Sequence, residues 1–176
     1  MTFKEETLDS QLIYEGAIMN VRKDTVTVRD GKTSFREIVE HNGGAAVVAL
    51  KENGNVVMVK QFRKPFERDV LEIPAGKIEK GEDPKETVIR ELKEETGYTA
   101  DNVELLCKFA PSVGYTTEVL YIYKATGLTP GETDFDPQES LDTVEYPLSE
   151  VVDMIKEGKI MDGKTMVGIL LTNQVL

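Results

Sequence analysis

Three glutamates near the middle of the chain have the spacing that gathers carboxylates on one side of a helix: Glu91, Glu94 and Glu95. Residues three and four positions apart are neighbours on a helix of about 3.6 residues per turn. Without a counter-ion these carboxylates repel one another. Hard divalent cations prefer carboxylate oxygens, and Mg²⁺ often binds carboxylates and substrate phosphates together. The spacing therefore predicts metal-assisted chemistry on a phosphate ester or anhydride.

The same carboxylates have a simpler interpretation as part of a solvated surface. Glu86, Arg90 and Glu94 follow one another at four-residue intervals, so they could form a ladder of surface ion pairs. Acidic residues alone do not separate these two interpretations. The residues around them do.

The segment from Gly76 to Tyr98 carries further residues at fixed intervals around these glutamates. Its sequence is GKIEKGEDPKETVIRELKEETGY. It matches the pattern G-x5-E-x7-R-E-U-x-E-E-x-G-U position by position, where U is an apolar residue. Leu92 and Tyr98 fill the U positions, the second as an aromatic variant. Through this segment the chain resembles the Nudix hydrolases.

The resemblance implies a role for each matched residue. Three acidic residues would bind or support a divalent metal, Mg²⁺ or Mn²⁺: Glu91, Glu94 and Glu95. Of these, Glu94 and Glu95 would also be catalytic. Four residues would be structural parts of the motif: Gly76, Glu82, Arg90 and Gly97. Glu82 and Arg90 would pair with each other and hold the loop against the helix.

Local sequence signals place this segment on a helix. Asp83 can cap a helix, Pro84 suits its first position and Gly97 provides a stop, so a helix is predicted over residues 84–96. Three of its apolar residues are predicted to pack on a sheet: Val88, Ile89 and Leu92.

Strands are predicted on both sides of this helix: residues 17–28, 34–39, 45–50, 55–62, 103–109 and 118–125. Asp30-Gly31 is a typical hairpin dipeptide between the first two. Residues 130–139 read as an acidic loop, and two helices follow over 149–156, with Ser149 as candidate cap, and 164–175. This order predicts an α/β or α+β sandwich. The resemblance specifies a Nudix α/β/α sandwich with a mixed central sheet and an N-terminal β-arm or small sheet.

Segments outside the motif resemble the ADP-ribose pyrophosphatase branch of these hydrolases. They are QFR at 61–63, LEIPAG at 71–76 and SVGYTTE at 112–118. The branch implies four substrate-binding residues: Arg36 at the adenosine end, Arg63 at the diphosphate, Glu72 and Gly114. It also implies that the backbone carbonyl of Ala75 binds one metal. An arginine fork suits phosphate physically, although an arginine on a strand is often only a surface ion pair.

The branch also has a catalytic glutamate in the loop before the penultimate helix. Glu139 is the best match within residues 130–139, and three acids are alternatives: Glu132, Asp134 and Asp136. The chain departs from the branch where a marker proline usually follows the motif, because Val113 stands there and Pro111 lies two positions earlier. This departure concerns the choice of substrate and not the hydrolytic chemistry.

These features predict metal-dependent hydrolysis of the diphosphate of ADP-ribose, or of a related ADP-sugar, to AMP and a sugar phosphate such as ribose 5-phosphate. Two alternatives stay open. One is a Nudix hydrolase of another nucleotide: another NDP-sugar, NADH or an oxidised nucleoside triphosphate. The other is a non-catalytic ADP-ribose sensor.

By the same analogy the chain divides into residues 1–42, a β-arm that would cross over to build a homodimer, and residues 43–176, the Nudix hydrolase domain. Composition agrees with one globular protein of 176 residues, and its net charge of −11 argues against nucleic acid or an anionic membrane as a partner. The single cysteine, Cys107, cannot form an intramolecular disulfide, and no long apolar run is present. We therefore expect a cytoplasmic protein.

One further motif is discounted. Residues 158–165, GKIMDGKT, match the P-loop pattern G-x4-G-K-[ST] letter for letter. A P-loop follows a buried strand, whereas residues 149–157 have a helical pattern for which Gly158 is an ordinary stop. We expect no nucleotide at this segment.

Overall fold

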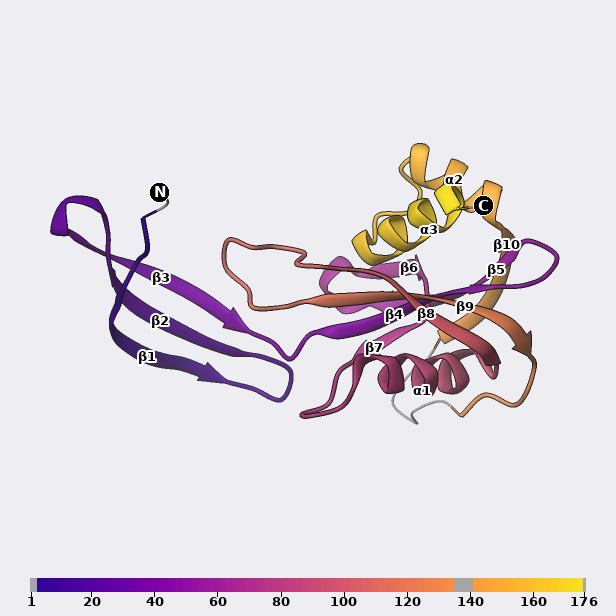
Figure 1. Ribbon diagram of the computed structural model, residues 1–176, viewed down its shortest axis with the longest axis horizontal. Coiled ribbons are helices and arrows are strands. Elements are labelled where there is room, and N and C mark those ends of the chain that lie inside the picture. Colours follow the sequence, from indigo (N-terminus) through magenta and orange to yellow (C-terminus); the bar gives the residue numbers. More distant parts are fainter. Residues whose placement is uncertain (1–2, 135–140, 176) are drawn as a thin grey trace. The chain divides into compact units, whose positions relative to one another are not determined.

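The structure is a computed structural model that describes residues 3–134 and 141–175 (Figure 1). The chain forms two compact units, which are described one at a time. Unit 1 comprises Met1–Gly43 and Ala110–Val119, and unit 2 comprises Gly44–Phe109 and Leu120–Leu176.

Unit 1 is built on a three-stranded antiparallel sheet in the order β1-β2-β3. Its strands are β1 (Thr7–Glu15), β2 (Asn20–Thr27) and β3 (Thr33–Glu40). The predicted hairpin between β2 and β3 is confirmed: the short turn η1 (Arg29–Gly31) places Asp30 and Gly31 at φ values of 68° and 69°. Both values are in the left-handed region that such a tight turn requires.

Strand β1 was not predicted from the sequence. Its nine residues, TLDSQLIYE, are all exposed. Since neither face of β1 is buried in the chain, no alternation of apolar and polar residues marks it as a strand.

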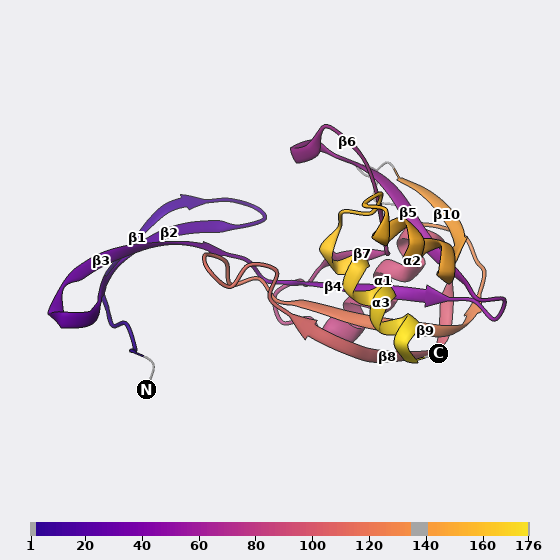
Figure 2. The same cartoon turned by 90° about the horizontal axis from the view of Figure 1, so that it is seen from above.

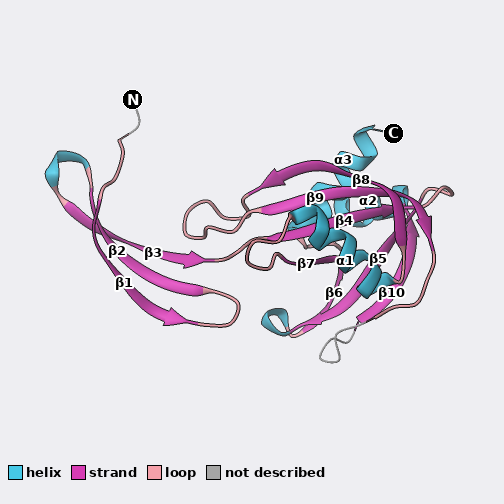
Figure 3. Ribbon diagram, turned by 60° about the horizontal axis from the view of Figure 1, so that its bottom comes forward, coloured by secondary structure: helices cyan, strands magenta, loops and turns pink. Residues whose placement is uncertain are grey.

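Unit 2 contains a seven-stranded sheet in the order β10-β5-β4-β9-β8, with β6 paired to β5 and β7 paired to β4 (Figures 1 and 3). The strands are β4 (Gly44–Leu50), β5 (Asn55–Arg63), β6 (Arg68–Glu72), β7 (Ala75–Lys77), β8 (Thr99–Phe109), β9 (Leu120–Thr129) and β10 (Leu141–Pro147). The pairing of β4 with β9 is parallel, and the other described pairings in this sheet are antiparallel. The mixed sheet that we expected is confirmed.

Helices cover both faces of this sheet (Figure 1). On one face, α1 (Pro84–Thr96) packs through Val88 and Leu92. On the other, α2 (Leu148–Lys156) and α3 (Gly163–Val175) enclose a second apolar cluster that includes Met58. Unit 2 is thus an α/β/α sandwich, and β4, buried along its whole length, lies between the two clusters.

Helix α1 has the boundaries that the sequence predicted. Asp83 accepts a hydrogen bond from the backbone of Lys85 at 2.8 Å, and Gly97 ends the helix with φ 74°. One packing prediction was wrong, because Ile89 is 48% exposed. Ile89 is rotated by about 100° from its buried neighbour Val88, which turns its side chain away from the sheet.

Two other predictions need correction. Strands β6, β7 and β10 were missed, since short strands carry little periodic signal. Ser149 is not the cap of α2: the helix begins at Leu148 after Pro147, and no side chain caps it. The backbone carbonyl of Gly54 accepts the Leu148 N–H at 3.0 Å, so a backbone group at this end of the helix is hydrogen-bonded to the neighbouring turn.

No helix in the described part of the chain has the length and apolar character needed to cross a membrane.

Candidate metal and phosphate site

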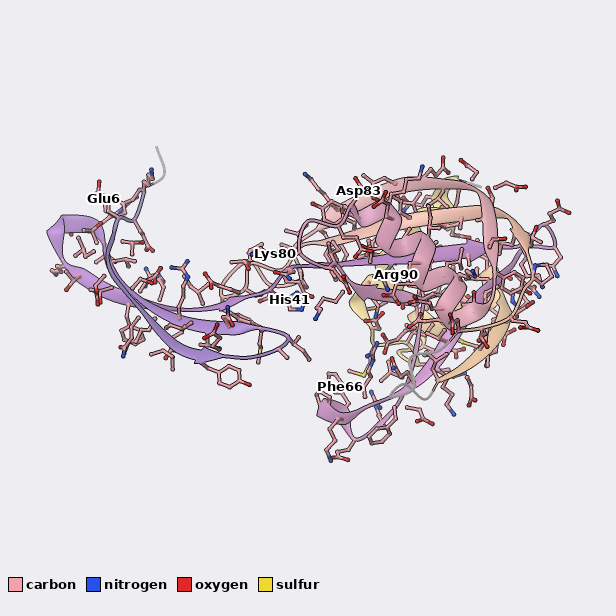
Figure 4. The ribbon with its side chains drawn as sticks, turned by 90° about the horizontal axis from the view of Figure 1, so that it is seen from below. Glu6, His41, Phe66, Lys80, Asp83 and Arg90 are labelled. Atoms are coloured by element: carbon pink, nitrogen blue, oxygen red, sulfur yellow. The ribbon has the colours of Figure 1, made fainter. Side chains whose placement is uncertain are left out.

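The guanidinium of Arg90 is the centre of an acidic cluster along α1. Its Nε and Nη2 donate to the two carboxylate oxygens of Glu82 at 3.2 and 3.3 Å. Its Nη1 donates to Glu91 at 2.7 Å and to Glu94 at 3.1 Å. Figure 4 labels Arg90 on α1 and the capping residue Asp83 at the start of the same helix. One cation therefore ties the loop before α1 to the carboxylates on the helix.

The pKa values of Glu82 and Arg90 are both shifted in the direction that favours the charged form. The backbone N–H of Glu79 and the guanidinium of Arg90 lower the pKa of Glu82 from 4.5 to about 2. Burial lowers the pKa of Arg90, but the carboxylates of Glu82 and Glu91 outweigh it and raise that pKa. The ion pair is therefore maintained across the pH range of ordinary assays.

Two of the three glutamates meet the short strand β7. The side chain of Glu95 is buried, and its Oε2 accepts a hydrogen bond from the backbone of Ala75 at 3.1 Å. At Gly76 a Cβ atom would overlap the carboxylate of Glu91. Only glycine allows the backbone of β7 to approach this carboxylate so closely, so the acidic face of α1 and the backbone of β7 form one site.

The donors at this site are those that a hard divalent cation uses. Glu91 and Glu95 supply carboxylate oxygens beside β7. Within residues 3–134 and 141–175, however, no three acidic, histidine or cysteine side chains are grouped closely enough to hold an ion. Arg90 holds Glu91 and Glu94 in this arrangement. The residues thus fit a divalent metal by their chemistry.

The chain on either side of residues 135–140 is attached to the C-terminal half of α1. The backbone N–H of Asp134 donates to the carbonyl of Glu94 at 3.1 Å, and Thr143 Oγ1 donates to the carbonyl of Glu95 at 3.0 Å. The candidate base Glu139 lies outside the described residues, as does its alternative Asp136. The other two alternatives, Glu132 and Asp134, are exposed.

Arg63, the candidate phosphate ligand, is held by the buried carboxylate of Glu72. Its Nε and Nη2 donate to the two oxygens of Glu72 at 2.6 and 2.7 Å. Lys164 donates to the same carboxylate and, at 3.0 Å, to Asp162. Burial raises the pKa of Glu72, but the bonds from Arg63 and Lys164 reverse this and hold it below its ordinary value.

The other two candidate substrate residues belong to unit 1. Arg36 on β3 donates from Nε to Glu5 at 3.0 Å and from Nη1 to the carbonyl of Phe35 at 2.8 Å. Gly114 is exposed in the segment 110–119, and no atom lies within 4 Å of the position of its Cβ. Glu72, Ala75 and the motif glutamates belong to unit 2. The substrate roles of Arg36 and Gly114 stay predictions.

Comparison with known protein families decides what this arrangement is. Residues 40–166 match the NUDIX domain family, and residues 5–39 match the family described as nucleoside diphosphate sugar hydrolase N-terminal domain. The chain belongs to the Nudix hydrolase family. The resemblance found in the sequence is thereby confirmed, and this Nudix hydrolase carries its motif on β7, α1 and the loop between them.

Relatives of this Nudix hydrolase match along nearly their whole length. A methanol dehydrogenase activator from Bacillus methanolicus is 43% identical over 169 residues, which cover 95% of this chain and 91% of the relative. An ADP-ribose pyrophosphatase from Bacillus subtilis (strain 168) is 38% identical over 170 residues, covering 96% and 92%. The crystal structure of an ADP compounds hydrolase has a TM-score of 0.87 over 100% of this chain and 96% of its own, at 21% identity. That likeness confirms the fold.

Sequence reasoning missed two residues beside Arg63 in this Nudix hydrolase: Asp162 and Lys164. They lie in residues 158–165, the P-loop-like segment at which we expected no nucleotide. Asp162 accepts hydrogen bonds from the backbone and hydroxyl of Thr165 at 3.0 and 2.6 Å, so it caps α3. The Asp-x-x-Thr spacing was the signal that could have identified this helix start.

Proposed function

We propose that this Nudix hydrolase cleaves the diphosphate of ADP-ribose or of a related ADP-sugar. Water adds to one phosphorus, the bridging P–O bond breaks, and AMP and a sugar phosphate, ribose 5-phosphate from ADP-ribose, are released. The observation that carries the proposal is the acidic face of α1 against β7, in a chain that is 38% identical to an ADP-ribose pyrophosphatase. The match of residues 5–39 to a nucleoside diphosphate sugar hydrolase N-terminal domain supports the same substrate class.

Each residue of the site has a proposed part. Glu91 and Glu95, assisted by Glu94 and the carbonyl of Ala75, would hold Mg²⁺ or Mn²⁺. A bound divalent ion neutralises phosphate oxygens and lowers the pKa of water. Arg63 would bind the diphosphate, whose charge and planar fork it complements.

Three further residues of the site are assigned by analogy with the family branch. Arg36 would contact the adenosine end, and Gly114 would line the substrate site. Glu139 would act as general base on the attacking water. Each assignment is a proposal that substitution of the residue can test.

Product release measures the proposed reaction directly. The nucleoside monophosphate released, AMP or GMP according to the substrate, is quantified after incubation with ADP-ribose, ADP-glucose, GDP-mannose, NADH or a nucleoside triphosphate, each with Mg²⁺, Mn²⁺ or EDTA. We expect fast turnover of ADP-ribose with metal and loss of turnover in EDTA. Faster turnover of another nucleotide would mean that the same site hydrolyses that nucleotide instead. Calorimetric binding of ADP-ribose without turnover would identify a sensor.

A second candidate function follows from the relative named methanol dehydrogenase activator, which is 43% identical to this chain. The chain would then raise the activity of a methanol dehydrogenase. A separate assay tests this function by measuring methanol dehydrogenase turnover in the presence and absence of the chain. An increase that Glu95→Gln abolishes would link activation to the hydrolytic site.

We also propose that residues 1–42 form an arm through which two copies associate, while residues 43–176 form the catalytic domain. The sheet of unit 1 exposes several large apolar side chains: Leu8, Leu12, Ile13, Tyr14 and Phe35. A second copy would cover them, since such a patch is a typical interaction surface. Light scattering should give twice the mass of 19.6 kDa, and Leu12→Glu should yield a monomer. A monomeric wild type would overturn the proposal.

Small nucleotides are the proposed partners besides this second copy, with neither nucleic acid nor membrane among them. The net charge of −11 supports this, because it opposes attraction to other polyanions. A cytoplasmic location is proposed as well, supported by the single cysteine, Cys107, which is free.

A further inference from the structure

A pocket of about 350 Å³ lies between the hairpin of β5 and β6 and the start of α3. Four charged side chains line it: Arg63, Glu72, Asp162 and Lys164. Figure 2 shows this hairpin extending from the rest of the seven-stranded sheet, and Figure 4 shows Phe66 at its tip. Of the four charged residues, Arg63 has a part in the proposed reaction and Glu72 is a substrate-binding residue expected from the sequence. The role of Lys164 is left to be explained.

Two cations share one buried carboxylate in this pocket. The Glu72 side chain is 4% exposed and is contacted by both Arg63 and Lys164. Lys164 contacts Glu72 through Oε2, the oxygen that also accepts from Arg63 Nη2. Asp162 also pairs with Lys164, so the two carboxylates balance the two cations and the pocket carries no net charge. Lys164 therefore competes with Arg63 for the negative charge of Glu72.

The position of Lys164 is fixed by its neighbours on α3. The cap of this helix, Asp162, also accepts a hydrogen bond from Lys164 at 3.0 Å. Thr165 Oγ1, which donates to that cap, accepts the backbone N–H of Ile73 at 2.9 Å, and this bond is buried. Because Ile73 directly follows Glu72 in the chain, the start of α3 and the end of β6 are held together at the carboxylate that Lys164 contacts.

We propose that Lys164 is a positioning residue for Arg63, which it serves by neutralising Glu72 so that the guanidinium can bind the diphosphate of the substrate. Without Lys164 the three remaining charges sum to minus one, and Glu72 compensates Arg63 completely. An anionic diphosphate then meets a weaker cation. The inference rests on the proposed function for the identity of the substrate. It assigns a role to Lys164, the lysine of the P-loop-like segment 158–165.

Lys164 could instead contact the substrate itself, and a double-mutant cycle separates the two roles. If Lys164 acts through Glu72, then Lys164→Met should not change KM once Glu72 is replaced by Gln, because the carboxylate that Lys164 neutralises is gone. If Lys164 binds phosphate directly, its removal costs the same in both backgrounds. The cycle therefore compares the wild type, Lys164→Met, Glu72→Gln and the double variant.

For Lys164→Met we expect KM for ADP-ribose to rise about tenfold while kcat changes by less than about threefold, because ground-state binding of the anion is weakened. Lys164→Arg, which keeps the charge, should restore most of the KM. In the Glu72→Gln background Lys164→Met should leave KM unchanged. Should Lys164→Met fail to fold, Lys164→Gln keeps a donor for Glu72 without the charge, and its KM should rise as well.

Lys60→Met is the matched control. Lys60 also lies on β5 and pairs with Asp69 at 3.0 Å, but alternation along the strand places it on the face opposite Arg63. Lys60→Met removes the same charge as Lys164→Met and should leave KM for ADP-ribose unchanged. An unaltered KM in Lys164→Met, or an undiminished effect in the Glu72→Gln background, would overturn the proposal.

The proposed function and this inference can fail separately. If the wild type does not hydrolyse ADP-ribose, the proposed substrate is wrong. The same variants are then compared by calorimetric binding of inorganic pyrophosphate. We expect Lys164→Met to bind this probe about tenfold more weakly than Lys60→Met does. Equal affinities would contradict the role of Lys164 whatever the substrate is.

Discussion

Glu95→Gln is expected to lower kcat for ADP-ribose by at least about a hundredfold while the protein stays folded. Glutamine preserves the shape of the side chain, and its carbonyl oxygen can still accept the Ala75 N–H that now bonds Glu95 at 3.1 Å. What is lost is the negative charge that would bind the metal. Removing one of several like charges should keep the melting temperature the same or raise it slightly. Steady-state kinetics with saturating Mg²⁺ and thermal melting measure the two quantities.

The matched control for this variant is Glu86→Gln. Glu86 is exposed on the same helix, so the chemical change is identical and the site is untouched. Its kcat should equal that of the wild type. Near-normal turnover in Glu95→Gln, or a large fall in Glu86→Gln, would contradict the metal site proposed on α1 and β7.

Arg90→Met is expected to reduce both stability and turnover. The guanidinium contacts three carboxylates, Glu82, Glu91 and Glu94, of which the first two are partly buried. Removing it leaves these negative charges close together, which should lower the free energy of unfolding by about 1–3 kcal/mol. Turnover should fall as well, since Glu91 and Glu94 lose the contact that orients them. Urea unfolding monitored by circular dichroism gives the change in stability.

The stability difference between the wild type and Arg90→Met should depend on pH. Because the pKa of Glu82 in the folded protein is lowered to about 2, its stabilising effect is complete above its ordinary pKa of 4.5 and is lost as pH falls through about 2. The difference should therefore be largest above pH 4.5 and shrink towards pH 2.

The control for Arg90→Met is Lys93→Met, which removes the same charge from the exposed side of α1. It should unfold like the wild type at every pH. A stability difference for Arg90→Met that is absent, or that grows as the pH falls, would show that the ion pair with Glu82 does not hold the loop.

Sequence alone predicted the helix of the motif to its boundaries. The signals there are local: Asp83 before the helix, Pro84 at its start and Gly97 at its end are read directly from neighbouring residues. Family membership was predicted for the same reason, because the motif is a continuous segment of residues 76–98. The α/β/α layers then followed from the resemblance.

The missed features depend on parts of the chain that are distant in sequence. Strand β1 has no buried face within the chain, and β6 is recognisable only by its pairing with β5. The contact of Lys164 with Glu72 joins residues 92 positions apart. No periodicity or spacing can predict such a contact, because the fold alone decides which side chains share a buried carboxylate.

Strand β7 connects β4, which is buried along its whole length, to the carboxylate of Glu95. Ala75 pairs with Ala46 on β4, and Val47 donates its backbone N–H to the carbonyl of Pro74 at 2.9 Å. The amide that holds Glu95 is therefore part of a rigid backbone ladder and not of a mobile side chain. If Glu95 holds the metal as proposed, its side chain loses little conformational entropy when metal and substrate bind, and we expect a change in packing around β4 to lower turnover before it unfolds the protein.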